Sequence, residues 1–181
     1  MARNMKLEVL QAARQQATSY DEWREISLEL DAHSGLDLWK IETASDNYHH
    51  ELLRERLLTL RQWQHSHNHK LLIRALREGL HHDLGNMGNP KLYGRAHVGT
   101  KRLIEDYVDQ VCTSLDYLCD ATIEHLSNDE KLALFEDITR SFGQPALQLS
   151  GGATLGMFHI GVCKALDEQG KATKVIMQVH D

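Results

Sequence analysis

The chain has 181 residues, enough for one domain or for one domain and part of another. Its 26 acidic residues outnumber its 20 basic residues, and the formal net charge is -6. An acidic chain without a concentrated run of lysine and arginine is a poor nucleic-acid binder, so we expect no nucleic-acid partner. Its three cysteines form no CxxC pair and no even disulfide framework, which favours a reducing compartment.

The first ten residues are charged and lack the apolar core of a signal peptide. The longest weakly charged stretch runs from Pro145 to Cys163 and contains several glycines, Ser150 and His159. That composition is typical of a strand, turn and helix rather than of a membrane span. We therefore expect a cytoplasmic location, with peripheral membrane association as the alternative.

Apolar residues recur at helical spacing for most of the chain. Ser19 and Glu22 have the spacing of a capping box, which opens a predicted helix with Trp23 and Leu30 on one face and Gly35 as its stop. The same three- and four-residue spacing predicts further helices from Tyr48 toward Trp63, from Leu71 to Gly79, from Ile104 to Leu118, and from a second capping box at Ser127 and Glu130 to Gly143.

The run GNMGNPKLYGRAHVG, residues 85–99, is dominated by glycine, asparagine and proline and predicts a structured loop. After Gly143 the period changes, and residues 146–149 predict a buried strand, 150–152 a turn, 154–169 a helix and 175–179 a second strand. The predicted fold class is a mainly α N-terminal domain, residues 1–143, followed by the truncated start of an α/β domain, residues 144–181.

The segment LSGGATLG, residues 149–156, leads from the first predicted strand directly into a helix. Such a turn directs backbone N–H groups to the space above the strand end, where the helix dipole also favours an anion. Phosphate binding and an oxyanion hole for acyl transfer both use this geometry, and a tight turn for helix–sheet packing is the structural alternative. GxGxxG is only approximated and no GKS or GKT follows, so the phosphate interpretation is weak.

The segments SYDEWREISLELD, YHHELLRERLLTLR, GLHHDLGNMGNPKLYGRAHVGTKRLIEDYV and SFGQPALQLSGGATLG resemble the helical region and the opening of the patatin domain in patatin-like triacylglycerol lipases. The resemblance covers the chain as far as Gly170. It implies a patatin-type α/β fold with a Ser–Asp dyad, a lipid ester substrate and no cofactor. It assigns the oxyanion-hole amides to Gly151, Gly152 and Ala153, and a packing role to Gly156.

The chain contains no GxSxG motif, so neither the nucleophilic serine nor its partner aspartate is present. Ser150 lies at the end of a strand rather than on a nucleophile elbow. We therefore expect the front part of a triacylglycerol lipase or phospholipase that is inactive alone. The alternative is a non-catalytic helical module that binds a membrane, a lipid droplet or a protein partner. The resemblance fades after Gly170, for which a frameshift or premature stop is the hypothesis.

Other side chains with chemical potential have simpler structural interpretations. On one helix His65 and His69 would share a face while His67 would not, so we expect no metal site. The spacing predicts a solvated helix face for Asp129, Glu130, Glu136 and Asp137, core packing for Trp23, Trp39 and Trp63, and packing of a buried helix, rather than a nucleophile pair, for His159 and Cys163.

Overall fold

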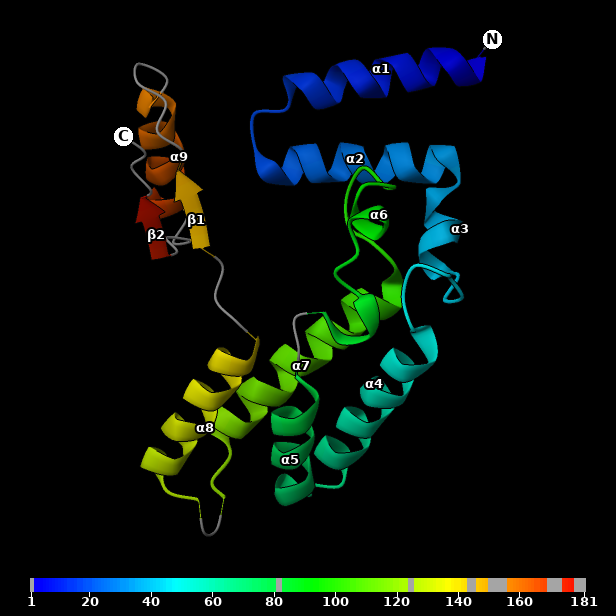
Figure 1. Ribbon diagram of the computed structural model, residues 1–181. Coiled ribbons are helices and arrows are strands. Elements are labelled where there is room, and N and C mark those ends of the chain that lie inside the picture. The colour runs from blue at the N-terminus through cyan, green and yellow to red at the C-terminus, as the bar shows by residue number, and fades with distance from the viewer. Residues whose placement is uncertain are drawn as a thin grey trace.

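The structure is a computed structural model that describes residues 2–80, 83–123, 126–142, 146–149, 156–168 and 174–177. The described chain is mainly helical, which confirms the predicted helical region (Figure 1). Its helices are α1 (Ala2–Gln16), α2 (Tyr20–Ser34), α3 (Leu36–Ile41), α4 (His50–His65), α5 (His69–Gly79), the 3-10 turn η1 (Leu84–Asn86), α6 (Pro90–Tyr93), α7 (Arg102–Asp120), α8 (Asn128–Phe142) and α9 (Gly156–Glu168).

Helices α1 and α2 pack side by side and run in opposite directions (Figure 1). The predicted boundaries of α2 are confirmed. The Ser19 hydroxyl accepts a hydrogen bond from the Glu22 backbone N–H at 3.2 Å, while the Glu22 carboxylate reaches back to the N–H of Thr18 at 2.9 Å. Gly35 ends the helix with a φ of 73°, a left-handed conformation that glycine adopts without steric cost.

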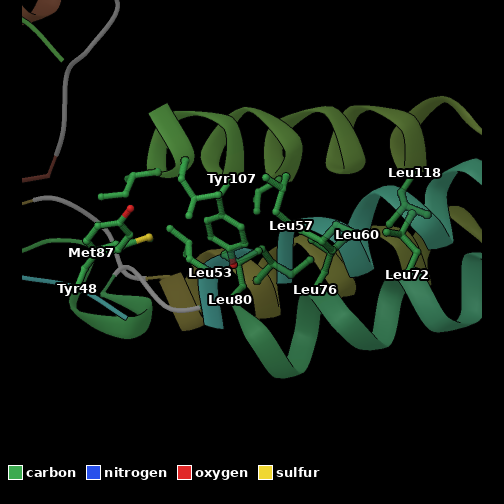
Figure 2. Packing of buried hydrophobic residues seen from close by; sticks show 14 of the residues in the cluster. Tyr48, Leu53, Leu57, Leu60, Leu72, Leu76, Leu80, Met87, Tyr107 and Leu118 are labelled. Carbon is green, nitrogen blue, oxygen red and sulfur yellow. The ribbon is translucent and has the colours of Figure 1, made fainter. Parts of the chain in front are cut away.

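Helices α4, α5, α7 and α8 enclose the main apolar core, with α4 against α7 and α5 against α8 (Figure 2). Each helix contributes apolar side chains mostly at three- and four-residue steps, and burial of a leucine or isoleucine side chain is worth about 1.5–3 kcal/mol. The buried residues of these four helices are Leu53, Leu57, Leu60, Leu72, Leu76, Leu103, Ile104, Tyr107, Val111, Leu118, Leu134 and Ile138.

The apolar core stops short of the first two helices. Leu10 in α1 and Leu30 in α2 are buried, yet neither belongs to the core cluster of the described residues. Trp39 and Trp63 pack against that cluster as predicted, whereas half-buried Trp23 lies outside it and stacks on Tyr20 with ring centroids 5.9 Å apart. Among the described residues, α3 therefore reaches the edge of the core through Trp39, whereas α1 and α2 contribute no residue to it.

The loop at residues 85–99 is structured, as predicted, and contains only the short helix α6 besides the end of η1. Its start is fixed to the segment before α4. The N–H of His49 donates to the carbonyl of Gly85 at 2.7 Å, and the side-chain amides of Asn86 and Asn89 both donate to the carbonyl of Asn47. The asparagine-rich composition therefore serves specific hydrogen bonds to a neighbouring segment.

The tail contains strands β1 (Ala146–Leu149) and β2 (Lys174–Met177), with α9 between them in sequence. The strands pair in parallel, from Ala146 opposite Lys174 to Leu149 opposite Met177. Parallel strands require a crossover connection, and a helix is its usual form.

Candidate functional site

The glycine-rich segment connects the carboxyl end of β1 to the first turn of α9. The predicted oxyanion donors Gly151, Gly152 and Ala153 lie outside the described residues, as does Ser150. Gly156, the predicted packing glycine, is the first residue of α9. The described elements on either side therefore have the strand–connection–helix order that an anion site at a helix N-terminus requires.

Helix α9 carries apolar side chains on its exposed side as well. His159 and Cys163 are one turn apart and half-buried. Met157, Phe158, Ile160 and Val162 are all exposed, Phe158 to 73%. A helix that is apolar all round normally lies inside a larger domain, so α9 as described lacks part of its cover. The prediction that it is a buried helix is therefore wrong for the described chain.

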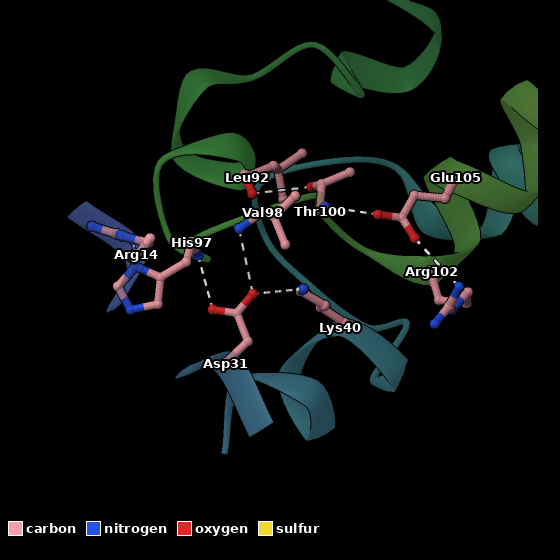
Figure 3. Close-up of polar contacts among 9 residues, drawn as sticks. All are labelled: Arg14, Asp31, Lys40, Leu92, His97, Val98, Thr100, Arg102 and Glu105. Atoms are coloured by element: carbon pink, nitrogen blue, oxygen red, sulfur yellow. Dashed lines mark hydrogen bonds and ion pairs between the residues drawn. The ribbon is translucent and has the colours of Figure 1, made fainter. Parts of the chain in front are cut away.

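Asp31 is the centre of a buried polar cluster that joins α2, α3 and the loop before α7 (Figure 3). Its side chain is 1% exposed, and one carboxylate oxygen lies 2.7 Å from the Lys40 ammonium. The other oxygen accepts the backbone N–H of His97 at 2.8 Å. The Arg14 guanidinium lies 2.8 Å from Nδ1 of His97, and because arginine only donates, Nδ1 is the acceptor. α2, α3 and the loop thus meet at the Asp31 carboxylate, and α1 is tied to the same loop through His97.

The same loop is anchored again at Thr100. Its hydroxyl donates to the carbonyl of Leu92 at 3.0 Å, and its backbone N–H donates to the Glu105 carboxylate at 3.0 Å (Figure 3). Gly99 has a φ of 71°, and a Cβ at that position would collide with the Glu105 side chain. These contacts hold the loop in one conformation against the first turn of α7.

Lys101 is only 1% exposed, although lysine side chains usually lie at the surface. Its ammonium donates to the carbonyls of Trp39 and Glu42, each at 2.8 Å, and lies 4.5 Å from the centroid of the Trp39 ring. Desolvation lowers the pKa of Lys101 below its ordinary value. The side chain satisfies carbonyls at the end of α3 that would otherwise lack donors.

A cleft of about 490 Å³ opens beside this cluster, between α2, α3, the loop before α7 and the first turns of α7. Its floor includes the buried Asp31–Lys40 pair, and its mouth includes the exposed side chains of Tyr20 and Arg24. Charged and apolar side chains share the lining, which is the composition of a site for a polar ligand with apolar parts.

The histidine cluster adopts an arrangement that helical spacing did not predict. His65 ends α4, His69 begins α5, and His67 lies in the turn between them with a φ of 51°. Nδ1 of His67 and Nε2 of His69 each lie 2.8 Å from the hydroxyl of Tyr117 in α7. The assumption of one continuous helix is therefore wrong, and these two histidines link the turn to α7.

Within the described ranges, no three His, Cys, Asp or Glu side chains are grouped so as to hold a metal ion. Asp129, Glu130, Glu136 and Asp137 are exposed on α8, as predicted. Ser127 and Glu130 form the predicted capping box: the Ser127 N–H donates to the Glu130 carboxylate, and the Glu130 N–H donates to the Ser127 hydroxyl. Hydrogen bonds from Ser127 lower the pKa of the Glu130 carboxyl group. None of the described helices has the length and apolar character that crossing a membrane requires.

A family model described as "Domain of unknown function (DUF3336)" matches residues 1–140. The chain belongs to this family.

The chain is similar to several longer proteins. The chain is 41% identical over 160 residues to "Triacylglycerol lipase ptl3" of Schizosaccharomyces pombe, covering 88% of this chain and 33% of the relative. It is 35% identical over 167 residues to "Triacylglycerol lipase 5" of Saccharomyces cerevisiae, covering 92% and 22%. It is 33% identical over 160 residues to "Patatin-like phospholipase domain-containing protein CNBE2340" of Cryptococcus neoformans, covering 88% and 18%.

The chain therefore spans between about one fifth and one third of the length of these relatives. Their names agree with the family that the sequence resembles. No solved structure matches the chain.

Sequence reasoning missed the cleft beside Asp31. A signal was present on α2, where Tyr20, Arg24, Leu28 and Asp31 recur at steps of four, four and three residues and share one face. The opposing wall comes from α3, a helix of six residues that no periodic pattern revealed.

Proposed function

We propose that this DUF3336 chain is the helical front and first βαβ unit of a patatin-like serine lipid acyl hydrolase, a triacylglycerol lipase or phospholipase. One observation carries the proposal. The likeness to the Schizosaccharomyces lipase extends over 160 residues, whereas the family match covers residues 1–140. At least 20 aligned residues therefore fall in or near the segment where β1 leads through the glycine-rich connection into α9.

The glycine-rich segment has the composition of an oxyanion hole. In this role the backbone N–H groups of Gly151, Gly152 and Ala153 stabilise the negative oxygen of the tetrahedral intermediate, at about 2.7–4 kcal/mol for one donor. Gly156 allows α9 to start close to the strand. The reaction needs no cofactor. The nucleophilic serine and its aspartate partner come from outside these 181 residues.

Two domains follow from this proposal, a helical domain at residues 1–143 and the start of a patatin-type α/β domain at 144–181. The exposed apolar side of α9 supports this division, because the remainder of an α/β domain would cover Phe158 and Ile160. The protein acts from the cytoplasm on lipid esters, with peripheral attachment to a membrane or lipid-droplet surface.

A chimeric enzyme tests the proposal. Residues 1–170 of this chain replace the matching segment of the Schizosaccharomyces lipase, and release of fatty acid from triolein emulsion is measured. We expect activity in the chimera and a fall in kcat of about 100-fold or more when Gly152→Val fills the oxyanion loop.

Arg74→Gln on α5 is the control, because this side chain is exposed and lies outside the glycine-rich segment. An unchanged rate in the Gly152→Val chimera would contradict the oxyanion assignment. A folded chimera without any lipase activity would instead favour a non-catalytic interaction module.

A further inference from the structure

Four of the charged side chains that line the cleft beside Asp31 form two ion pairs. On the floor, Asp31 and Lys40 form a buried pair with nitrogen and oxygen 2.7 Å apart. At the wall, Arg102 and Glu105 lie 3.6 Å apart in a looser pair. These four groups neutralise one another, and they already have protein partners.

Three further charges face the same cleft without such partners. Arg24 in α2, Asp37 in α3 and Asp109 in α7 line the cleft, and all three are exposed at its mouth. Within the part of the chain that the structure describes, none of these three side chains forms an ion pair or a hydrogen bond with another group. One cation and two carboxylates, held on three different helices, are thus available to a ligand that carries both signs of charge.

An aromatic face completes the mouth. Tyr20 lines the cleft and is 65% exposed, and its ring stacks on half-buried Trp23 with an angle of 26° between the planes. The stack holds the Tyr20 ring in place at low entropic cost. Aromatic faces attract organic ammonium groups through cation–π interactions, and quaternary ammonium ions above all. Leu28 and Ile41 add exposed apolar side chains to the lining of the cleft.

We propose that the cleft between α2, α3 and α7 binds a zwitterionic phosphate–ammonium group of the phosphocholine or phosphoethanolamine type. Arg24 takes the phosphate, because a guanidinium donates two parallel hydrogen bonds to phosphate oxygens. Asp37 and Asp109 neutralise the ammonium, whose methyl or methylene groups lie against the Tyr20 ring. The paired floor of Asp31 and Lys40 limits the depth of the site, so the rest of the ligand projects outward.

The choice of a lipid headgroup as the ligand rests on the proposed function, because the relatives are named lipases and phospholipases, which act on glycerolipids. The same chemistry occurs on a phospholipid in a bilayer and on a free glycerophosphodiester. Soluble headgroups contain no acyl ester, so their binding is measured independently of hydrolysis. Failure here leaves the chimera experiment unaffected, and failure of the chimera leaves this binding measurable.

Binding is followed in the full 181-residue chain by NMR line broadening and isothermal titration calorimetry with glycerophosphocholine and glycerophosphoethanolamine. A second arm uses flotation with phosphatidylcholine vesicles and, for comparison, phosphatidylglycerol vesicles. We expect saturable binding of the soluble headgroups. Capture by phosphatidylcholine vesicles in addition identifies the lipid as the source, whereas soluble binding alone identifies the free phosphodiester.

Four variants at the mouth test the roles of the side chains. We expect Arg24→Gln, and Asp37→Asn combined with Asp109→Asn, each to weaken binding at least tenfold. Tyr20→Ala should weaken it as well, while Tyr20→Phe should retain it. Arg74→Gln on α5 and Asp116→Asn on α7 are matched controls, because both side chains are exposed and lie outside the cleft. All these sites are on the surface, and circular dichroism checks that each variant folds.

Three outcomes overturn the proposal. The first is the absence of binding to either headgroup at millimolar concentration. The second is binding that the cleft variants and the controls change equally. The third is binding of choline alone as tight as that of glycerophosphocholine and unaffected by Arg24→Gln, which would make the site one for simple cations.

Discussion

Asp31 and Lys40, nine residues apart, meet at 2.7 Å in a place with almost no access to water. The pair joins α2 to α3, and Asp31 in addition accepts the backbone N–H groups of the loop before α7. The loop N–H groups that donate to Asp31, the Lys101 ammonium that donates to the end of α3, and Trp39 on the edge of the apolar core therefore join the first three helices to the rest of the domain.

We expect Asp31→Ala to destabilise the protein by about 3–5 kcal/mol, because it leaves the Lys40 ammonium buried without a counter-charge. Urea unfolding followed by circular dichroism measures the change. Arg74→Ala is the control, since the exposed Arg74–Glu78 pair should contribute no more than about 1 kcal/mol. Equal losses in the two variants would show that Asp31 has no special role.

Lys101 should resist acylation by an amine-reactive reagent that modifies exposed lysines such as Lys91, because its ammonium is buried and bonded to two carbonyls. Peptide mass spectrometry of the native and urea-unfolded protein measures this difference. Lys101→Met should cost about 1–3 kcal/mol through the unpaired carbonyls of Trp39 and Glu42. Rapid modification of native Lys101 would contradict the described burial.

Stability should fall as the pH rises above about 10. Burial raises the pKa of Tyr48 and Tyr107 above the ordinary tyrosine value, so the unfolded chain loses these protons first. Their contribution is complete below about pH 10 and is lost as the pH rises through the folded-state pKa values. Urea midpoints between pH 9 and 11.5, with phenolate absorbance at 295 nm, measure the effect.

Tyr107→Phe should flatten this alkaline decline. Lys101 has the opposite effect on the pH dependence of stability. Its pKa is lowered in the folded protein, so stability rises with pH in the range just below the ordinary lysine pKa. The comparison of Tyr107→Phe with the parent isolates the tyrosine effect, and identical pH slopes in the two proteins would refute it.

Tyr117→Phe should destabilise the protein by about 0.5–1.5 kcal/mol, because the hydroxyl joins His67 and His69 to α7. Thermal unfolding at pH 7.5 measures this change. Tyr20→Phe is the control, since no hydrogen bond of the Tyr20 hydroxyl is described and its ring is 65% exposed. A larger loss for Tyr20→Phe than for Tyr117→Phe would sink the interpretation.

A chain of these 181 residues should hydrolyse neither short- nor long-chain esters and should resist labelling by a fluorophosphonate probe. Its sequence contains no GxSxG, and an oxyanion hole without an activated nucleophile does not transfer acyl groups. The active chimera described above serves as the positive control. Stoichiometric labelling of Ser150 would contradict this prediction.

The helices that the sequence predicted have a clear apolar period, and two of them also have a capping box. The boundaries of α2 follow from Ser19 and Gly35, and α7 follows from its long run of regularly spaced apolar residues. Helix α1 was missed because it has no recognisable cap and buries little besides Leu10, against α2. With six residues, α3 is too short for a period to show.

The polar cluster could not be predicted in the same way. Asp31 belongs to a helix with several other acidic residues, and nothing in the local sequence distinguishes it from exposed Glu25 or Glu29. Its partners His97 and Val98 lie 66 and 67 residues later, so only the folded chain shows the contact. The histidine pair was missed for a related reason, because the break between α4 and α5 at His67 changes which faces meet.

Because hydrogen bonds rather than leucine packing hold α1 and α2 to the helical core, their detachment exposes little hydrocarbon. Denaturant sensitivity and heat capacity both scale with the surface that an opening uncovers. Amides of α1 and α2 should therefore exchange with deuterium through an opening whose free energy hardly depends on urea. Amides of α4 and α7, which enclose Leu57 and Tyr107, should exchange only through a transition that urea promotes steeply.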